Sequence, residues 1–193
     1  MLTSNMRTHL IPFSVAICAI IVPINDTQAK PYFAEISTSA SIDSGSVKVR
    51  DADEQSKSSF NADVSWLFLI KQFEVGPIVS YVTNSSSGTN ASALDLGPMF
   101  KWNFGVLGAD STVPFAYGSL QFGSSQNTYG GFTGTYNGTS LSVGGGVNFM
   151  MGQNVSFQPR LERYYSSRTS SGGRSVSVVS SGFKMLFGIS IFI

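Results

Sequence analysis

The chain has 193 residues and a formal net charge of +1, and only 12% of its residues are charged, against about 25% in an average soluble domain. Aromatic residues also make up 12%, led by 15 phenylalanines, and there are 20 glycines. This composition excludes an intrinsically disordered chain and a long amphipathic-helix protein, and the near-neutral charge offers no basic face to a nucleic acid. What remains is a β-rich chain that folds in an unusual solvent.

Residues 1–29 are predicted to be a cleaved signal peptide. Arg7 precedes an apolar run from Leu10 to Val22, and the segment ends in Thr27-Gln28-Ala29, which suits a cleavage site. The run is shorter than the ~20 residues that a membrane-spanning helix needs. Cleavage after Ala29 removes His9 and Cys18, the only histidine and cysteine. The remaining domain, 30–193, is therefore expected to be exported without a thiol or an imidazole.

Residues 30–193 lack a helical period and instead contain runs of alternating polar and apolar residues, separated by Gly, Ser, Asn and Asp clusters. Their lengths bracket the ~9–11 residues with which a tilted strand crosses a bilayer. The predicted strands are 31–43, 59–70, 72–83, 91–104, 111–124, 138–150, 154–168 and 175–193. Eight is an even number, as expected for a bacterial barrel. The fifth strand has the least defined boundaries.

The predicted connections alternate in length. In chain order the connections are 44–58, 71–72, 84–90, 105–110, 125–137, 151–153 and 169–174, of which 44–58 and 125–137 are long, 71–72 and 151–153 are short, and 105–110 is longer than ideal for a short turn. Short periplasmic turns and longer outer loops are the rule in outer-membrane barrels.

Charged residues share one parity within these runs. In the second run, the even-numbered positions from Phe60 to Ile70 are all apolar, with the small Ala62 among them. Asp63 lies on the other face. If the apolar face meets lipid, the charged residues point into the lumen, because side chains alternate along a strand. This predicts a lumen ionic network of Glu35, Asp63, Glu74, Asp95, Lys101, Arg160, Glu162 and Lys184. A soluble β-sandwich would share the alternation, but the face opposite the apolar one is here dominated by Gly and Ser.

Arg163 breaks this parity. A Lys or Arg that faces lipid costs ~2–4 kcal/mol at the bilayer midplane and almost nothing at its edge. Its place late in the seventh run therefore predicts a position near the outer rim. The same alternation predicts two aromatic girdles at the membrane boundaries, where amphipathic rings collect. The predicted girdle residues are Tyr32, Trp66, Phe68, Phe73, Tyr81, Trp102, Phe104, Phe149 and Tyr165, and Tyr164 is expected beside Tyr165.

These features together resemble the small eight-stranded outer-membrane barrels of the OmpA transmembrane-domain and OmpX type. The resemblance rests on the signal peptide, the strand count, the alternating connections and the closing run 182–193. It implies an all-β fold: an eight-stranded antiparallel up-and-down transmembrane β-barrel in the bacterial outer membrane. Such proteins end in a strand that resembles the signal for the barrel-assembly machinery, but this chain ends in Ile193 rather than an aromatic residue, and Phe192 has inward parity.

The family covers many functions, so the fold alone assigns none. The outer-membrane barrel enzymes that this chain resembles in architecture use a catalytic histidine, and a serine is a poor nucleophile without a base. We therefore expect no enzyme activity, metal or cofactor. The principal hypothesis is a structural or surface-interaction platform with the ionic network filling the lumen. A narrow pore is the alternative, favoured by small inward residues such as Gly76 and Gly97, and a lipid-modifying enzyme is the second alternative.

Partners are expected at the surface. The lipid and lipopolysaccharide of the outer membrane, the barrel-assembly machinery and an external ligand are the candidates, and no nucleic acid is expected. Aromatic rings set among Gly and Ser residues suit adaptable contacts or packing on the barrel rim. Guanidinium groups match the geometry of the phosphates of lipopolysaccharide. The candidate loop contacts are Tyr129, Phe132, Tyr136, Arg163, Arg168 and Arg174. The triplet Gly144–Gly146 lies within a strand pattern and is expected to relieve crowding rather than bind phosphate.

Overall fold

A computed structural model describes residues 32–49, 55–86, 89–109, 111–129, 132–170 and 176–193. The predicted signal peptide lies outside the described residues. The strands are β1 (Ala34–Val49), β2 (Gln55–Ile70), β3 (Phe73–Ser86), β4 (Thr89–Asn103), β5 (Thr112–Tyr129), β6 (Phe132–Met150), β7 (Val155–Ser170) and β8 (Ser177–Phe192). In the described ranges, no helix has the length and apolar character needed to cross a bilayer.

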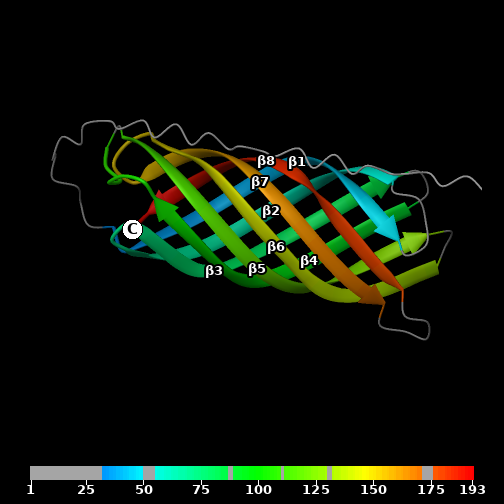
Figure 1. Cartoon of the computed structure of the whole chain (residues 1–193). Helices are drawn as coiled ribbons and strands as arrows, with labels where there is room; N and C mark the ends of the chain where they lie inside the picture. Colours follow the sequence, from blue (N-terminus) through cyan, green and yellow to red (C-terminus); the bar gives the residue numbers. More distant parts are fainter. Residues whose placement is uncertain (1–31, 50–54, 87–88, 110, 130–131, 171–175) are drawn as a thin grey trace, which may run out of the picture.

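The strands pair in chain order, and β8 pairs with β1, so the sheet closes into an antiparallel barrel (Figure 1). This confirms the predicted eight-stranded up-and-down topology. Following the paired residues from Ser39 through all eight strands returns to β1 at Val49, ten residues further along. Such a stagger goes with strands tilted by ~35–45° to the axis, and the arrows in Figure 1 run obliquely. Eight strands enclose a lumen that side chains can fill.

We call the end of the barrel that holds Tyr32 and the C-terminal Ile193 the inner end, and the opposite end the outer end. The backbone N–H of Ile193 donates to the carbonyl of Ala34 at 2.9 Å, which extends the β1–β8 pairing to the last residue. Lys71 turns the chain between β2 and β3 with a φ of 61°. The other inner connections join β4 to β5 through 104–111 and β6 to β7 through 151–154.

At the outer end the strands are longer than the sequence predicts. The predicted loop 125–137 is wrong: β5 continues to Tyr129, β6 begins at Phe132, and these two residues face each other in the ladder. The predicted connections 44–58 and 84–90 shorten in the same way. Ser, Thr, Asn and Gly are typical of turns. Here the adjoining strands satisfy their backbone groups, so they extend the sheet beyond its apolar part.

The barrel is apolar outside and polar inside, the reverse of a soluble domain. On β8, the outward side chains Phe183, Met185, Phe187, Ile189 and Ile191 are 45–55% exposed. Gly188 and Ser190 on the opposite face are buried. Among the outward residues, Ser124 follows Phe122 on β5 and Thr139 precedes Leu141 on β6, so the apolar band ends before the strands do. A continuous apolar surface of this kind fits contact with hydrocarbon.

Candidate functional site: the lumen and its two ends

All eight residues of the predicted ionic network lie inside the barrel. Seven are buried, and the Lys184 side chain is 12% exposed. They form separate groups along the lumen rather than one cluster. The group nearest the inner end has Lys101 between two carboxylates: its Nζ pairs with Glu35 Oε2 and lies 3.4 Å from Glu74 Oε1.

Amides and hydroxyls complete this inner group. Asn103 Nδ2 donates to Glu74 Oε1 at 2.5 Å, and Gln158 Nε2 donates to Glu35 Oε1 at 3.0 Å. Ser190 Oγ donates to the same Glu35 oxygen at 2.8 Å. Buried charges need both a partner and hydrogen bonds to be tolerated. We call Glu35, Glu74 and Lys101 the inner charge cluster.

The next group lies further out and centres on Glu162. Lys184 Nζ lies 3.4 Å from Glu162 Oε1, which also accepts from Ser142 Oγ at 2.9 Å. Tyr117 donates its hydroxyl proton to Glu162 Oε2 at 3.0 Å, and its ring faces the Arg160 guanidinium, 5.3 Å from the centroid. Every oxygen of this carboxylate therefore has a donor.

The Arg160 guanidinium donates to Ser39, whose Oγ in turn donates to Asp63 at 3.4 Å. This chain links β7 to β2 through β1. Glycines leave room for the large side chains: a Cβ on Gly144 would lie 2.8 Å from the Tyr117 ring, and one on Gly146 would lie 2.9 Å from that of Phe115. The predicted relief of crowding thus has definite neighbours.

The outermost charged pair corrects the prediction for Arg168. This residue does not face lipid but turns into the lumen, where its Nη2 donates to Asp95 Oδ1 at 2.8 Å and Oδ2 at 2.6 Å. Asp95, Gly123, Gly138 and Arg168 face one another in turn across β4 to β7. A Cβ on Gly138 would lie 2.9 Å from Arg168 Cγ, and one on Gly123 would overlap the Asp95 carboxylate. The two glycines therefore leave the space in which the pair forms.

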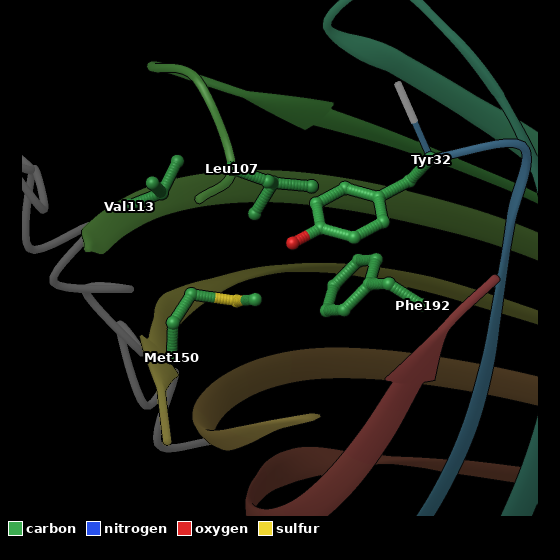
Figure 2. Close-up of a cluster of buried hydrophobic side chains, with 5 residues drawn as sticks. All are labelled: Tyr32, Leu107, Val113, Met150 and Phe192. Carbon is green, nitrogen blue, oxygen red and sulfur yellow. The ribbon is translucent and has the colours of Figure 1, made fainter. Parts of the chain in front are cut away.

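An apolar cluster, which we call the apolar plug, lies at the inner end and corrects the prediction for Tyr32. The plug consists of Tyr32, Leu107, Val113, Met150 and Phe192, and Figure 2 shows these side chains turned toward one another. Tyr32 is buried rather than part of a girdle, because its ring packs 5.3 Å from that of Phe192 and its hydroxyl donates to the Gln153 carbonyl. Leu107 comes from the connection between β4 and β5.

A second apolar cluster lies next to the inner charge cluster and consists of Leu67, Ile78, Met99, Phe115 and Tyr117. The Lys101 ammonium lies 4.6 Å from the centroid of the Phe115 ring. Sequence reasoning missed both apolar clusters, although the signal for the second was present: each of Leu67, Met99 and Phe115 occupies an inward position in its strand.

The other predicted girdle residues do point outward. These eight side chains, all at least 42% exposed, are Trp66, Phe68, Phe73, Tyr81, Trp102, Phe104, Phe149 and Tyr165. Several stack along the surface near the inner end: Phe73 lies 5.6 Å from Trp102, which lies 4.9 Å from Phe104. Tyr164 is buried and faces the lumen, since it alternates with Tyr165 on β7.

Among the described side chains, the predicted loop contacts do not share one face of the sheet. Tyr129 and Phe132 close the β5–β6 hairpin, but their side chains lie outside the described part of the structure, as does Arg174. Tyr136 is half-buried with inward parity on β6. Arg163 points outward and is exposed, with its guanidinium 4.7 Å from the centroid of the Phe183 ring.

Known structures with the same architecture were found by comparison. Neisserial surface protein A is 16% identical, with a TM-score of 0.60, over 83% of this chain and 97% of that chain. The outer membrane protein OprG from Pseudomonas aeruginosa is 12% identical, with a TM-score of 0.53, over 86% and 97%. The chain has the fold of the small eight-stranded outer-membrane β-barrels. No protein-family model and no curated protein matches its sequence.

Most of the charged lumen residues of this barrel are paired with one another. Carboxylates meet ammonium and guanidinium groups, and several carboxylate oxygens also accept from amides and hydroxyls, whereas Asp63 Oδ1 and Glu74 Oε2 are buried without a hydrogen-bond donor. Among the described residues, no three Asp, Glu, His or Cys side chains are grouped so that they could hold a metal ion. The arrangement places ionic pairs at several depths of the lumen.

Proposed function

We propose that the protein is an integral protein of the bacterial outer membrane whose barrel is a closed, non-conducting platform. The platform displays its outer strands at the cell surface and carries out no catalysis. The outward apolar band and the architecture that the chain has in common with outer-membrane proteins support this location. A signal peptide over residues 1–29 would supply the export route, and the barrel-assembly machinery the insertion.

The observation that carries the proposal is that two sets of buried side chains lie next to each other at the inner end of the lumen. The apolar plug packs across the opening, and the buried inner charge cluster lies next to it. A hydrated ion would have to displace apolar side chains and also separate Lys101 from Glu35, both of which cost free energy. The glycines that favoured a pore do not leave free space either, since a Cβ on Gly76 or Gly97 would overlap the backbone of the next strand.

The outer end supports the role in surface interactions. Beyond the apolar band, the outward side chains on β5 and β6 are polar and uncharged, and Thr128 and Thr133 hydrogen-bond to each other at 3.1 Å on the exposed surface. A rigid sheet that carries hydroxyls and amides offers hydrogen bonds at little cost in conformational entropy. Lipopolysaccharide and an external ligand are the partners that this surface would meet.

Planar-bilayer recording tests the proposal. The folded barrel is reconstituted at high protein load, and a sixteen-stranded porin under identical conditions verifies that insertion gives measurable current. We expect no conductance from the barrel above the lipid baseline, together with a heat-dependent shift in gel migration that reports a folded barrel. Ohmic steps that scale with the amount of protein would refute a closed platform and favour the pore. A monomer that stays soluble without detergent would refute the membrane location.

A further inference from the structure

Arg163 is an isolated cation on the apolar outer surface. Ten charged residues lie in strands and have described side chains, and Arg163 is one of them. The other nine point into the lumen: Glu35, Asp63, Glu74, Asp95, Lys101, Arg160, Glu162, Arg168 and Lys184. Every described carboxylate is therefore on the other side of the sheet from Arg163. Within the described residues its guanidinium has no carboxylate partner.

The neighbours of Arg163 are apolar on all sides. It faces Val143 on β6 and Phe183 on β8 in the ladder, and Leu161 and Tyr165 flank it among the outward residues of β7. All four are exposed to the same surroundings. The Phe183 ring holds the guanidinium in place by a cation–π contact.

The outer edge of the apolar band is within reach of this side chain. The next outward residue on β7 is Tyr165, and the following ones are Ser167 and Thr169. Two residues of strand span about 7 Å, which is close to the length of an extended arginine. Arginine extends its charged group toward the membrane interface when its stem lies in hydrocarbon, so an extended Arg163 side chain would bring the guanidinium from the Phe183 ring to the level of the lipid headgroups.

We propose that Arg163 binds a phosphate group of a phosphorylated glycolipid in the outer leaflet, with Tyr165 beside it. The inference rests on the proposed function, because it requires the barrel to span the outer membrane with its inner end toward the periplasm. A guanidinium presents a planar fork of donors that matches phosphate in two parallel hydrogen bonds. The missing carboxylate partner leaves that fork available.

The surface above Arg163 favours a glycolipid over a simple phospholipid. Thr139 on β6, Ser167 and Thr169 on β7, and Ser181 on β8 continue the outward face beyond the apolar band. Their hydroxyl groups both donate and accept hydrogen bonds, as sugar hydroxyls require. The site therefore combines an apolar wall for acyl chains, a cation for phosphate and a hydroxyl surface for sugar.

Native mass spectrometry on the delipidated, full-length barrel in detergent micelles tests the site. The probes are lipid A with both phosphates, the same lipid with both phosphates removed, and inorganic phosphate. The variants are Arg163→Gln, Arg163→Lys and the control Lys71→Gln, which removes an equal charge at an exposed inner turn. We expect Arg163→Gln to weaken binding of phosphorylated lipid A about tenfold, Arg163→Lys less, and Lys71→Gln not at all.

The expected pattern also requires that the wild-type barrel prefer phosphorylated over dephosphorylated lipid A, and that inorganic phosphate not displace the lipid. Equal binding of the two lipids, or an equal loss in Arg163→Gln and Lys71→Gln, would refute the site. Displacement by inorganic phosphate would show an anion site without lipid recognition and would also refute it. Any of these refuting results leaves the proposed function intact, provided that each variant still inserts into planar bilayers and conducts no current. Conductance or a failure to insert would instead refute the proposed function itself.

Discussion

The two ends of the lumen are filled by different means. At the inner end, two carboxylates share one ammonium group among buried amides, next to the apolar plug. At the outer end, one carboxylate meets one guanidinium above two glycines, and the pair is partly exposed, with 12% of the Arg168 side chain accessible. The inner charge cluster is therefore fully buried, whereas the outer pair is slightly exposed, and we expect the inner end to be drier than the outer end.

This difference sets what each ion pair contributes. In a dry interior, separating a pair leaves a charge that neither solvent nor protein compensates, so the loss of one partner costs several kcal/mol. Near water the same loss is partly compensated by hydration. Substitutions at the two ends should therefore have effects that differ in size, although the groups involved are chemically similar.

The largest effect is expected from Lys101→Met, which leaves Glu35 and Glu74 buried without their cation. We expect a loss of about 3–5 kcal/mol in the free energy of unfolding. Urea unfolding in lipid vesicles measures it, with the fluorescence of Trp66 and Trp102 as the signal, because both rings are on the outer surface. The triple variant Lys101→Met with Glu35→Gln and Glu74→Gln carries no charge there and should regain most of the loss. A single variant as stable as the triple variant would show that the inner charge cluster is not dry.

The apolar plug gives the next largest effect. Leu107→Ala removes buried side-chain atoms from a turn that can partly collapse, so we expect a loss of about 2 kcal/mol, at the lower end for a buried leucine. Val106→Ala in the same turn is the control, because Val106 is 47% exposed, and it should change stability by less than about 0.5 kcal/mol. Equal losses in the two variants would mean that Leu107 does not seal the lumen.

Much of the inner end could be predicted from the alternation of inward and outward residues in the sequence. The positions of Glu35, Glu74 and Lys101 follow from alternation alone, as do the eight strands, because a charge on the lipid side is penalised. The plug was missed because Leu107 lies in a turn and Tyr32 lies before β1, where strand parity does not apply. Both reach the lumen only through the way the chain folds back over the barrel opening.

The outer end was less predictable for two physical reasons. The Ser-, Thr- and Asn-rich segments around residues 125–137 have the composition of turns, and only their pairing across the closed sheet makes them strands. The partner of Arg168 depends on the register of four strands, which the alternation of any one strand does not contain. Parity alone does place Arg168 on the inward face, but not beside Asp95.

The smallest of these effects is expected at the outer end, where a double-mutant cycle of Asp95→Asn and Arg168→Gln isolates the ion pair. We expect a coupling free energy of about 1 kcal/mol, within the range for contacting residues and well below the loss expected for Lys101→Met. Since Ser140 donates to Asp95 at 3.1 Å, the carboxylate keeps one donor when the arginine is replaced. Each single variant should therefore remain folded, as heat-dependent gel migration would report.

The cycle also decides how wet the outer end is. If water reaches the pair, raising the salt concentration lowers the coupling, because mobile ions screen exposed charges far more than buried ones. A coupling as large as several kcal/mol that does not change with salt would place Asp95 and Arg168 in an environment as dry as that of Lys101. The distinction between the two ends would then fail, and the lumen would have to be regarded as sealed along its whole length. Gly123 and Gly138 would in that case exclude water from the outer end, in addition to leaving room for the Asp95–Arg168 pair.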